Sequence, residues 1–241
     1  ESQGHRVRFV EPRHGSALTS VVITKNDLID VTIVRDQGEF LLAHTEAVQD
    51  FESWNRRDYG RPYADPKSGM LPPKVARMAV NIALRRFAPQ GKQGVLLDPF
   101  CGMGTIVAEA LVSGWNVIGS DQSNDVVEKA GKNLEWLEGS HPSGKDAILP
   151  DVKFFVSDAT HVSEHLKPES VDAIVTEPFL GSTEIGDKRH LQEKVKNMIK
   201  GLEKLYIGCL RDWQKILKPG GKVIIALPEY RIEDKMFFVK K

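Results

Sequence analysis

The stretch Val95–Thr105, which reads VLLDPFCGMGT, decides the fold of this 241-residue chain. Its first three residues predict a short buried strand, Asp98 begins a turn, and Gly102 and Gly104 come just before an apolar helix. Glycine has no Cβ, so a turn of this kind brings a ligand close to the backbone. We therefore expect a ligand-binding strand–turn–helix unit, the alternative being an ordinary tight turn that binds nothing.

The spacing of these glycines narrows the kind of ligand. A dinucleotide-binding turn carries a third glycine three positions after the second, where it lets the helix pack closely on the strand. In this chain Val107 stands at that position. A nicotinamide cofactor therefore fits poorly, and a ligand without a pyrophosphate fits better.

The segment Asp98–Thr105 resembles the S-adenosylmethionine (SAM) loop of class I methyltransferases that methylate amino groups of nucleic-acid bases. This resemblance implies that the loop surrounds the methionine part of SAM, with Asp98 near its ammonium group. The cofactor-binding residues implied within the loop are Asp98, Phe100, Cys101, Gly102, Gly104 and Thr105. For Cys101 a nucleophilic role is the alternative, and we expect a small space-filling side chain instead.

Strands alternate with helices after this loop, which predicts a parallel sheet with right-handed crossovers. We expect strands at 116–121, 152–156, 171–176 and 222–227, a helix from about 124 to 137, a short helix near 161–165 and a long helix from about 191 to 217. Residues 236–239 are expected to begin the terminal hairpin of such a sheet. The expected fold class is α/β, a Rossmann-like class I methyltransferase sheet with helices on both faces.

Two carboxylates follow the second and third of the predicted strands. Asp121 ends the strand at 116–121, where a carboxylate can accept both hydroxyls of a ribose. The alternative for Asp121 is a cap on the helix that follows. The class I resemblance implies that Asp158 holds the adenine amino group, and a cap on a short helix is the alternative there.

The segment Glu177–Gly181 follows the strand at 171–176, at the edge of the sheet where ligands of open α/β sheets bind. Base-amino methyltransferases carry Asp-Pro-Pro-Tyr or Asn-Pro-Pro-Tyr here, and this chain has Glu-Pro-Phe-Leu. The resemblance implies that Glu177 and the carbonyl of Pro178 accept hydrogen bonds from an exocyclic amine. Phe179 could stack on an extruded base. The alternative is a loop with no catalytic role.

Residues 1–54 contain β-rich segments at 7–10, 18–24, 31–34 and 40–42, and we expect them to be the remnant of an N-terminal RNA-binding region. Turn formers predict a linker at 55–72. Residues 73–241 form the expected methyltransferase domain, beginning with a helix at Pro73. The family resemblance places Pro72 and Pro73 at the border of the SAM pocket.

Arg57–Pro62 and Gly69–Ala76 resemble the tRNA guanine-N2 methyltransferases that modify position 10. That resemblance implies a THUMP-associated RNA-binding region and N2-methylguanosine in tRNA as the product. DNA or ribosomal RNA as the substrate, or a SAM- or RNA-binding module without catalysis, stay open. Some relatives use a small activator subunit, so such a partner also stays open.

Charge is concentrated just before the SAM loop, although the whole chain has a net charge of zero. Nine basic residues stand there against Asp58 and Asp65, and such a patch suits a phosphate backbone, the alternative being a solvated helix face. The nine are Arg56, Arg57, Arg61, Lys67, Lys74, Arg77, Arg85, Arg86 and Lys92.

Composition excludes several other classes of protein. Hydrophobic residues make up 41% of the chain, yet no apolar run is long enough to cross a membrane and no signal peptide is visible. The two cysteines are far apart, so we expect free thiols in a reducing compartment and a cytoplasmic protein. No cluster of His and Cys has metal-ligand spacing, so no metal is expected. Because the first residue is Glu1, we expect a piece of a longer protein.

Overall fold

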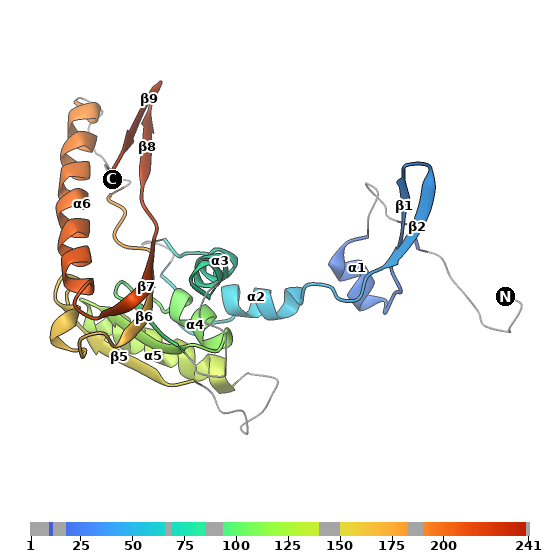
Figure 1. Cartoon of the computed structure of the whole chain (residues 1–241), viewed down its shortest axis with the longest axis horizontal. Coiled ribbons are helices and arrows are strands. Elements are labelled where there is room, and N and C mark those ends of the chain that lie inside the picture. Colours follow the sequence, from blue (N-terminus) through green and yellow to red (C-terminus); the bar gives the residue numbers. More distant parts are fainter. Residues whose placement is uncertain are drawn as a thin grey trace, which may run out of the picture. The chain divides into compact units, whose positions relative to one another are not determined.

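The computed structural model describes residues 10–11, 18–65, 69–84, 94–139, 150–182 and 190–239 (Figure 1). The chain divides into two compact units, Glu1–Arg56 and Arg57–Lys241. The second unit contains every residue that the sequence assigns to the candidate site.

The described residues of the first unit form a short helix, a hairpin and the beginning of a further helix at Phe51. Strands β1 (Val31–Asp36) and β2 (Glu39–His44) pair antiparallel, which confirms the strands expected at 31–34 and 40–42. The strand expected at 18–24 is wrong, because α1 (Ser20–Lys25) is a helix. Its β-branched residues suit a strand, but the Thr19 side chain accepts a hydrogen bond from the Val22 N–H and caps the first turn. The strand expected at 7–10 lies outside the described residues except for its last one.

A parallel five-stranded sheet forms the centre of the second unit and confirms the predicted α/β fold. Its strands stand in the order β5-β4-β3-β6-β7. Their bounds are β3 Val95–Asp98, β4 Asn116–Asp121, β5 Val152–Val156, β6 Val171–Thr176 and β7 Leu217–Ile225. Because β3 is central, the turn after it lies between the carboxyl ends of β4 and β6.

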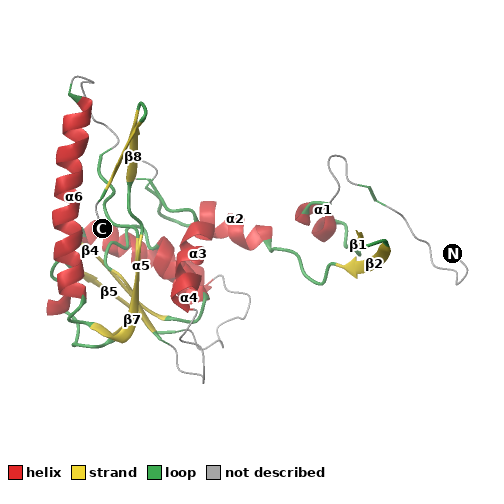
Figure 2. Cartoon of the chain, turned by 45° about the horizontal axis from the view of Figure 1, so that its top comes forward, coloured by secondary structure: helices red, strands yellow, loops and turns green. Residues whose placement is uncertain are grey.

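Helices cover both faces of this sheet, as expected (Figure 2). Helices α3 (Pro73–Leu84), α4 (Thr105–Val112) and α5 (Asn124–Gly139) supply the core on one face, where they pack on Leu96 and Val117. Helix α6 (Leu191–Trp213) and the short 3-10 helix η2 (Val162–Glu164) supply the core on the other face.

Two predicted boundaries are corrected by the structure. Helix α2 (Phe51–Tyr59) occupies the start of the segment expected to be an extended linker. Helix α6 ends at Trp213, short of the expected residue 217, and β7 begins at Leu217 rather than at 222. The glycines at 220 and 221 do not break the chain direction, because they lie in a bulge between the pairs Val171↔Leu217 and Ala173↔Lys222.

The hairpin formed by residues 229–238 does not extend the main sheet. Its strands β8 (Glu229–Ile232) and β9 (Lys235–Phe238) pair only with each other within the described residues. The hairpin lies beside α6 (Figure 1), where Tyr230, Ile232 and Phe237 pack on the buried side of that helix. The expectation that residues 236–239 begin a hairpin of the sheet is therefore corrected: they end a separate one.

Within the part of the chain that the structure describes, each helix is too short or too polar to span a lipid bilayer.

Candidate functional site

Three carboxylates converge at the carboxyl ends of the central strands. Asp98 ends β3, Asp121 ends β4, and Glu177 directly follows β6. Burial of Asp98, which is 1% exposed, together with the charges of Asp121 and Glu177 raises its pKa to about 7. The order of the strands therefore brings three of the predicted site residues close enough for the charges of Asp121 and Glu177 to affect the pKa of Asp98.

Asp98 is fixed by two hydrogen bonds to one of its carboxylate oxygens. The hydroxyl of Thr176, at the end of β6, donates to Oδ1 at 2.7 Å. The backbone N–H of Phe100 donates to the same oxygen at 3.2 Å. These bonds lower the pKa of Asp98 and partly oppose the effect of burial.

The two glycines of the turn adopt backbone conformations that favour glycine. Gly102 has φ 51° and Gly104 has φ 84°. A Cβ on Gly104 would also approach the Leu134 side chain of α5 to 3.2 Å, whereas one on Gly102 would meet open space. Gly102 thus leaves bare backbone facing outward, as a ligand-binding turn requires.

Cys101 fills the inside of this turn. Its side chain is buried, and burial raises the pKa of the thiol far above its usual range. Its N–H donates to the Ser120 carbonyl of β4 at 2.9 Å. A thiol in this setting is not ionised at neutral pH, so the geometry agrees with a space-filling role and not with a nucleophile.

Asp121 ties the glycine turn to the start of α5. Its Oδ2 accepts from the Gly102 N–H at 3.4 Å and its Oδ1 accepts from the Ser123 N–H at 3.0 Å. Ser123, whose hydroxyl oxygen lies 3.5 Å from the Val126 nitrogen, caps the helix itself. Asp121 is therefore placed beside the turn rather than on the helix end.

Asp158 stands at the same edge but makes different contacts. The Ser157 N–H donates to the Asp121 carbonyl at 3.0 Å, which places the segment next to β4. The Asp158 carboxylate accepts from the N–H and the hydroxyl of Thr160 at 2.8 and 2.7 Å, and these bonds lower its pKa. In this structure the Asp158 carboxylate closes a turn just before η2. It is not the helix cap that the sequence left open, because His161 stands at the N-cap of η2.

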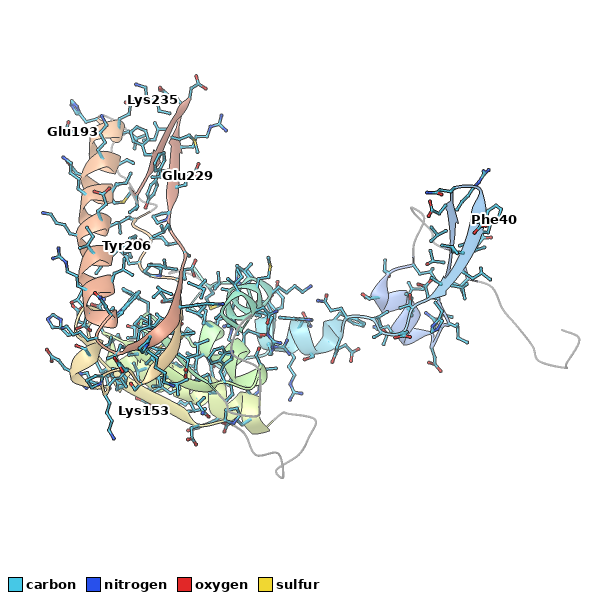
Figure 3. The ribbon with its side chains drawn as sticks, in the orientation of Figure 1. Phe40, Lys153, Glu193, Tyr206, Glu229 and Lys235 are labelled. Atoms are coloured by element: carbon cyan, nitrogen blue, oxygen red, sulfur yellow. The ribbon has the colours of Figure 1, made fainter. Side chains whose placement is uncertain are left out.

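The loop carrying Glu177 is held from two sides by tyrosines that the sequence did not reveal. The Tyr206 hydroxyl of α6 donates to the Phe179 carbonyl at 2.7 Å, and Figure 3 shows this side chain on the side of α6 that faces the loop. The Tyr230 hydroxyl of β8 donates to the Leu180 carbonyl. Both tyrosines come from elements distant in sequence, so no local pattern points to them.

The side chains of this loop differ in exposure. Pro178 is buried, Glu177 is half-buried, and burial raises the pKa of the Glu177 carboxyl. Phe179 is 59% exposed, although its carbonyl and that of Leu180 are held by the tyrosines. An exposed aromatic ring beside a partly desolvated carboxylate can stack on a flat ligand.

The back of the glycine turn is braced by the segment that follows α2. The Asn133 side chain of α5 binds both the N–H and the carbonyl of Tyr63 at 2.9 Å, and it donates to the Met103 carbonyl at 3.0 Å. Arg61 Nη1 donates to the Thr105 hydroxyl at 2.7 Å. Sequence reasoning missed Asn133, and it gave Thr105 a cofactor role that these contacts do not show.

Pro72 and Pro73 stand at the start of α3. The Pro72 carbonyl accepts the first hydrogen bonds of α3, from Val75 and Ala76. Pro73 lines a shallow hollow, with Arg57, Arg61 and Thr105 among its other lining residues. Asp98, Asp121 and Glu177 do not line this hollow. The placement of the two prolines at the border of the SAM pocket stays a prediction.

Besides Arg61, which donates to the Thr105 hydroxyl, two further residues of the predicted basic patch are used inside the protein. Arg57 Nε lies 2.7 Å from Oε1 of Glu109, and Arg77 Nη2 lies 2.8 Å from Oε2 of the same carboxylate. Glu109 is 1% exposed on α4. The structure thus gives these two arginines a structural role. Lys67, Arg85, Arg86 and Lys92 lie outside the described residues.

The raised pKa of Asp98 predicts a pH-dependent stability. Between about pH 4 and 7 the folded protein keeps a proton on Asp98 that the unfolded chain has released, so the free energy of unfolding falls as pH rises, by about 4 kcal/mol. Asp98→Asn should remove this part of the fall. Urea unfolding of both proteins at pH 5 and pH 8 measures the difference, and an equal loss in both would contradict the assignment.

The brace at Asn133 predicts a second effect on stability. Asn133→Ala leaves polar groups of Tyr63 and Met103 without partners, at a cost of about 3 kcal/mol in the free energy of unfolding. Amide hydrogen exchange at residues 102–104 should also become faster. The matched control is Asn197→Ala on the exposed face of α6, and equal midpoints of urea unfolding for the two variants would refute the brace.

Among the described residues, no group of three or more His, Cys, Asp or Glu side chains is arranged to hold a metal ion.

Comparison with known proteins places this arrangement in a family. A family model described as a methyltransferase domain matches residues 90–240. A tRNA (guanine(10)-N2)-dimethyltransferase from Methanothermobacter thermautotrophicus is 31% identical over 206 residues, which cover 84% of this chain and 51% of that protein. A protein of the same name from Pyrococcus abyssi is 35% identical over 175 residues, which cover 72% of this chain and 42% of that protein.

A U6 snRNA (guanine-N(2))-methyltransferase from Bos taurus is 28% identical over 156 residues, covering 64% of this chain and 26% of that protein. The chain spans about half the length of the archaeal relatives that it matches. The family model covers more than half of this chain and includes the glycine turn, Asp121, Asp158 and the loop at Glu177. The chain therefore belongs to the methyltransferase domain family, with the Rossmann-like α/β fold of class I SAM-dependent methyltransferases.

Proposed function

We propose that this protein transfers a methyl group from SAM to the exocyclic N2 amine of a guanosine in tRNA. The observation that carries the proposal is the position of Glu177, which directly follows β6 and lies within electrostatic reach of Asp98 in the glycine turn. The names of the archaeal relatives, which methylate N2 of guanosine 10 in tRNA, support the choice of substrate.

The residues present fit SAM as the cofactor. SAM carries positive charge on its ammonium and sulfonium groups. Asp121, and Asp98 once it ionises above about pH 7, supply negative charge beside the glycine turn, with Glu177 at the same edge of the sheet. Gly102 leaves open space above bare backbone beside them. When bound, SAM supplies a methyl group on a positively charged sulfur, which is open to attack by a nitrogen lone pair.

The acceptor amine needs help from the protein because its lone pair is delocalised into the base. The Glu177 carboxylate and the Pro178 carbonyl would accept its two hydrogens and draw them out of the plane of the ring, which aims the lone pair at the methyl group. Burial raises the pKa of Glu177, so its carboxylate accepts a proton more readily than an exposed one. Tyr206 and Tyr230 keep this loop in place.

Phe179 gives the site a surface for the base itself. Its ring is largely exposed next to Glu177, while its carbonyl is fixed by Tyr206. Guanine extruded from a helix or loop would stack on this ring and present its N2 amine to the carboxylate. Asp121 is the residue that would hold the ribose of SAM.

Parallel transfer reactions test the proposal. The purified chain is incubated with methyl-labelled SAM and with unmodified tRNA, ribosomal RNA or DNA, and the incorporated label is counted. We expect label in tRNA. Label found only in ribosomal RNA or DNA would show that the substrate is not tRNA. SAM binding without transfer to any of the three nucleic acids would show that the protein is a binding module and not an enzyme.

A further inference from the structure

The exposed face of α6 carries four basic side chains in one row. Lys196, Lys200, Lys204 and Arg211 are all exposed, and their spacing of 4, 4 and 7 residues places them within about 80° of arc on an α-helix. We refer to these four residues as the α6 basic row. The buried residues of the helix, such as Val195 and Tyr206, lie on the opposite side.

The α6 basic row is not neutralised in the described part of the chain, where none of its four members is in an ion pair. Other lysines near it are paired: Lys215 lies 2.9 Å from Asp212, and Lys218 lies 2.7 Å from Asp172. The acidic side chains of α6 before its buried Asp212 are Glu193 in the first turn (Figure 3) and the half-buried Glu203, and the Glu193 carboxylate faces His190 at 3.9 Å.

Helix α5 shows how this chain builds an ordinary solvated helix face. There Asp125 pairs with Lys129 at 2.6 Å and Glu128 pairs with Lys132 at 2.5 Å, both at the i,i+4 spacing that stabilises a helix. In α6 the same spacing joins Lys196 to Lys200 and Lys200 to Lys204, which repel each other. The α6 basic row therefore does not stabilise the helix. Its like charges are explained if they bind a polyanion outside the protein.

The position of α6 connects this row to the reactive loop. Tyr206 on the inner side of α6 donates to the Phe179 carbonyl, two residues from Glu177. The helix is about 10 Å across, so the row stands at a fixed distance from the loop. A polyanion chain bound along the row is thereby held in a set position relative to Glu177.

We propose that the α6 basic row binds the phosphate backbone of the RNA substrate. This inference rests on the proposed function, because it names the surface that holds the substrate of that same site. Lysine and arginine side chains that neutralise phosphates release counterions, so binding through them depends steeply on salt. The row supplies affinity and orientation, and base identity is read elsewhere.

The test is tRNA binding by the whole chain as a function of salt. The variant K196Q/K200Q/K204Q removes three charges and keeps good helix formers, and K129Q/K132Q on α5 is the matched control. Neutralising three phosphate contacts should reduce the slope of log Kd against log salt concentration by about 2 to 3. The control should keep the wild-type slope, and all three proteins should bind SAM equally and remain folded at the assay temperature.

Transfer is measured separately from binding. At saturating tRNA the triple variant should keep the wild-type kcat and show a raised KM. A wild-type slope in the triple variant would overturn the inference and leave the proposed function standing. A wild type that binds tRNA through the row but transfers no methyl group would overturn only the proposed function. Weakened binding to polyglutamate with unchanged binding to tRNA would assign the row to an acidic protein and overturn the inference.

Discussion

Replacing Glu177 with alanine is expected to lower kcat for methyl transfer about 10²- to 10³-fold. The side chain is the one carboxylate that directly follows β6, and its removal leaves the acceptor amine with one hydrogen-bond acceptor fewer. SAM affinity should change little, because Asp98 and Asp121 remain on the glycine turn. The expected result is thus a loss in the chemical step with binding of the cofactor retained.

Single-turnover transfer to tRNA and calorimetric binding of SAM separate the two effects. Glu177→Asp keeps a carboxylate and should retain more activity than Glu177→Ala, although the shorter side chain reaches less far. Glu229→Ala, at an exposed position on β8, is the matched control and should behave as wild type. Transfer by Glu177→Ala at the wild-type rate would remove Glu177 from the mechanism.

Glu109→Gln is expected to cost about 3 to 5 kcal/mol in the free energy of unfolding. The Glu109 carboxylate is buried and lies against the guanidinium groups of Arg57 and Arg77. Glutamine has nearly the same shape but no charge, so the two largely buried arginines lose their counter-ion. The substitution thus destabilises the protein in two ways: two ion pairs are lost, and the positive charge of the arginines stays buried without a counter-ion.

Urea unfolding, followed by circular dichroism, measures this effect. The matched control is Glu128→Gln on α5, which breaks an exposed pair with Lys132 and should leave the unfolding midpoint unchanged. Equal midpoints for Glu109→Gln and wild type would show that the arginine contacts contribute nothing to stability.

The sequence predicts the second unit well because its signals are local. Gly102 and Gly104 mark a turn that needs positive φ, and the strands at 116–121, 152–156 and 171–176 are short apolar runs between turn formers. The right-handed crossovers between them, together with the reversal of the strand order at β6, place helices on both faces of the sheet. The meeting of Asp98, Asp121 and Glu177 could therefore be predicted without any knowledge of side-chain contacts.

The contacts that hold the site in place could not be predicted. Glu109 looks like any acidic residue on a short helix, and its burial depends on two arginines distant in the chain. Asn133 and Tyr206 likewise act on segments far from them in sequence. Pairing of this kind depends on tertiary packing, which no local periodicity records.

Local signals also failed where two of them competed. At 20–25 the β-branched residues favour a strand, yet the Thr19 cap begins a helix. At 218–221 proline and two glycines favour a break, yet β7 passes through a bulge and continues to pair with β6.

Mass spectrometry of nucleosides tests the central claim most directly. An unmodified tRNA transcript is incubated with the protein and SAM, digested, and compared with the same reaction catalysed by Glu177→Ala. We predict N2-methylated guanosine in the wild-type reaction and its near absence in the variant. Methyl groups found only on adenosine or cytidine, or unmodified tRNA after incubation with a protein that binds SAM, would contradict the account.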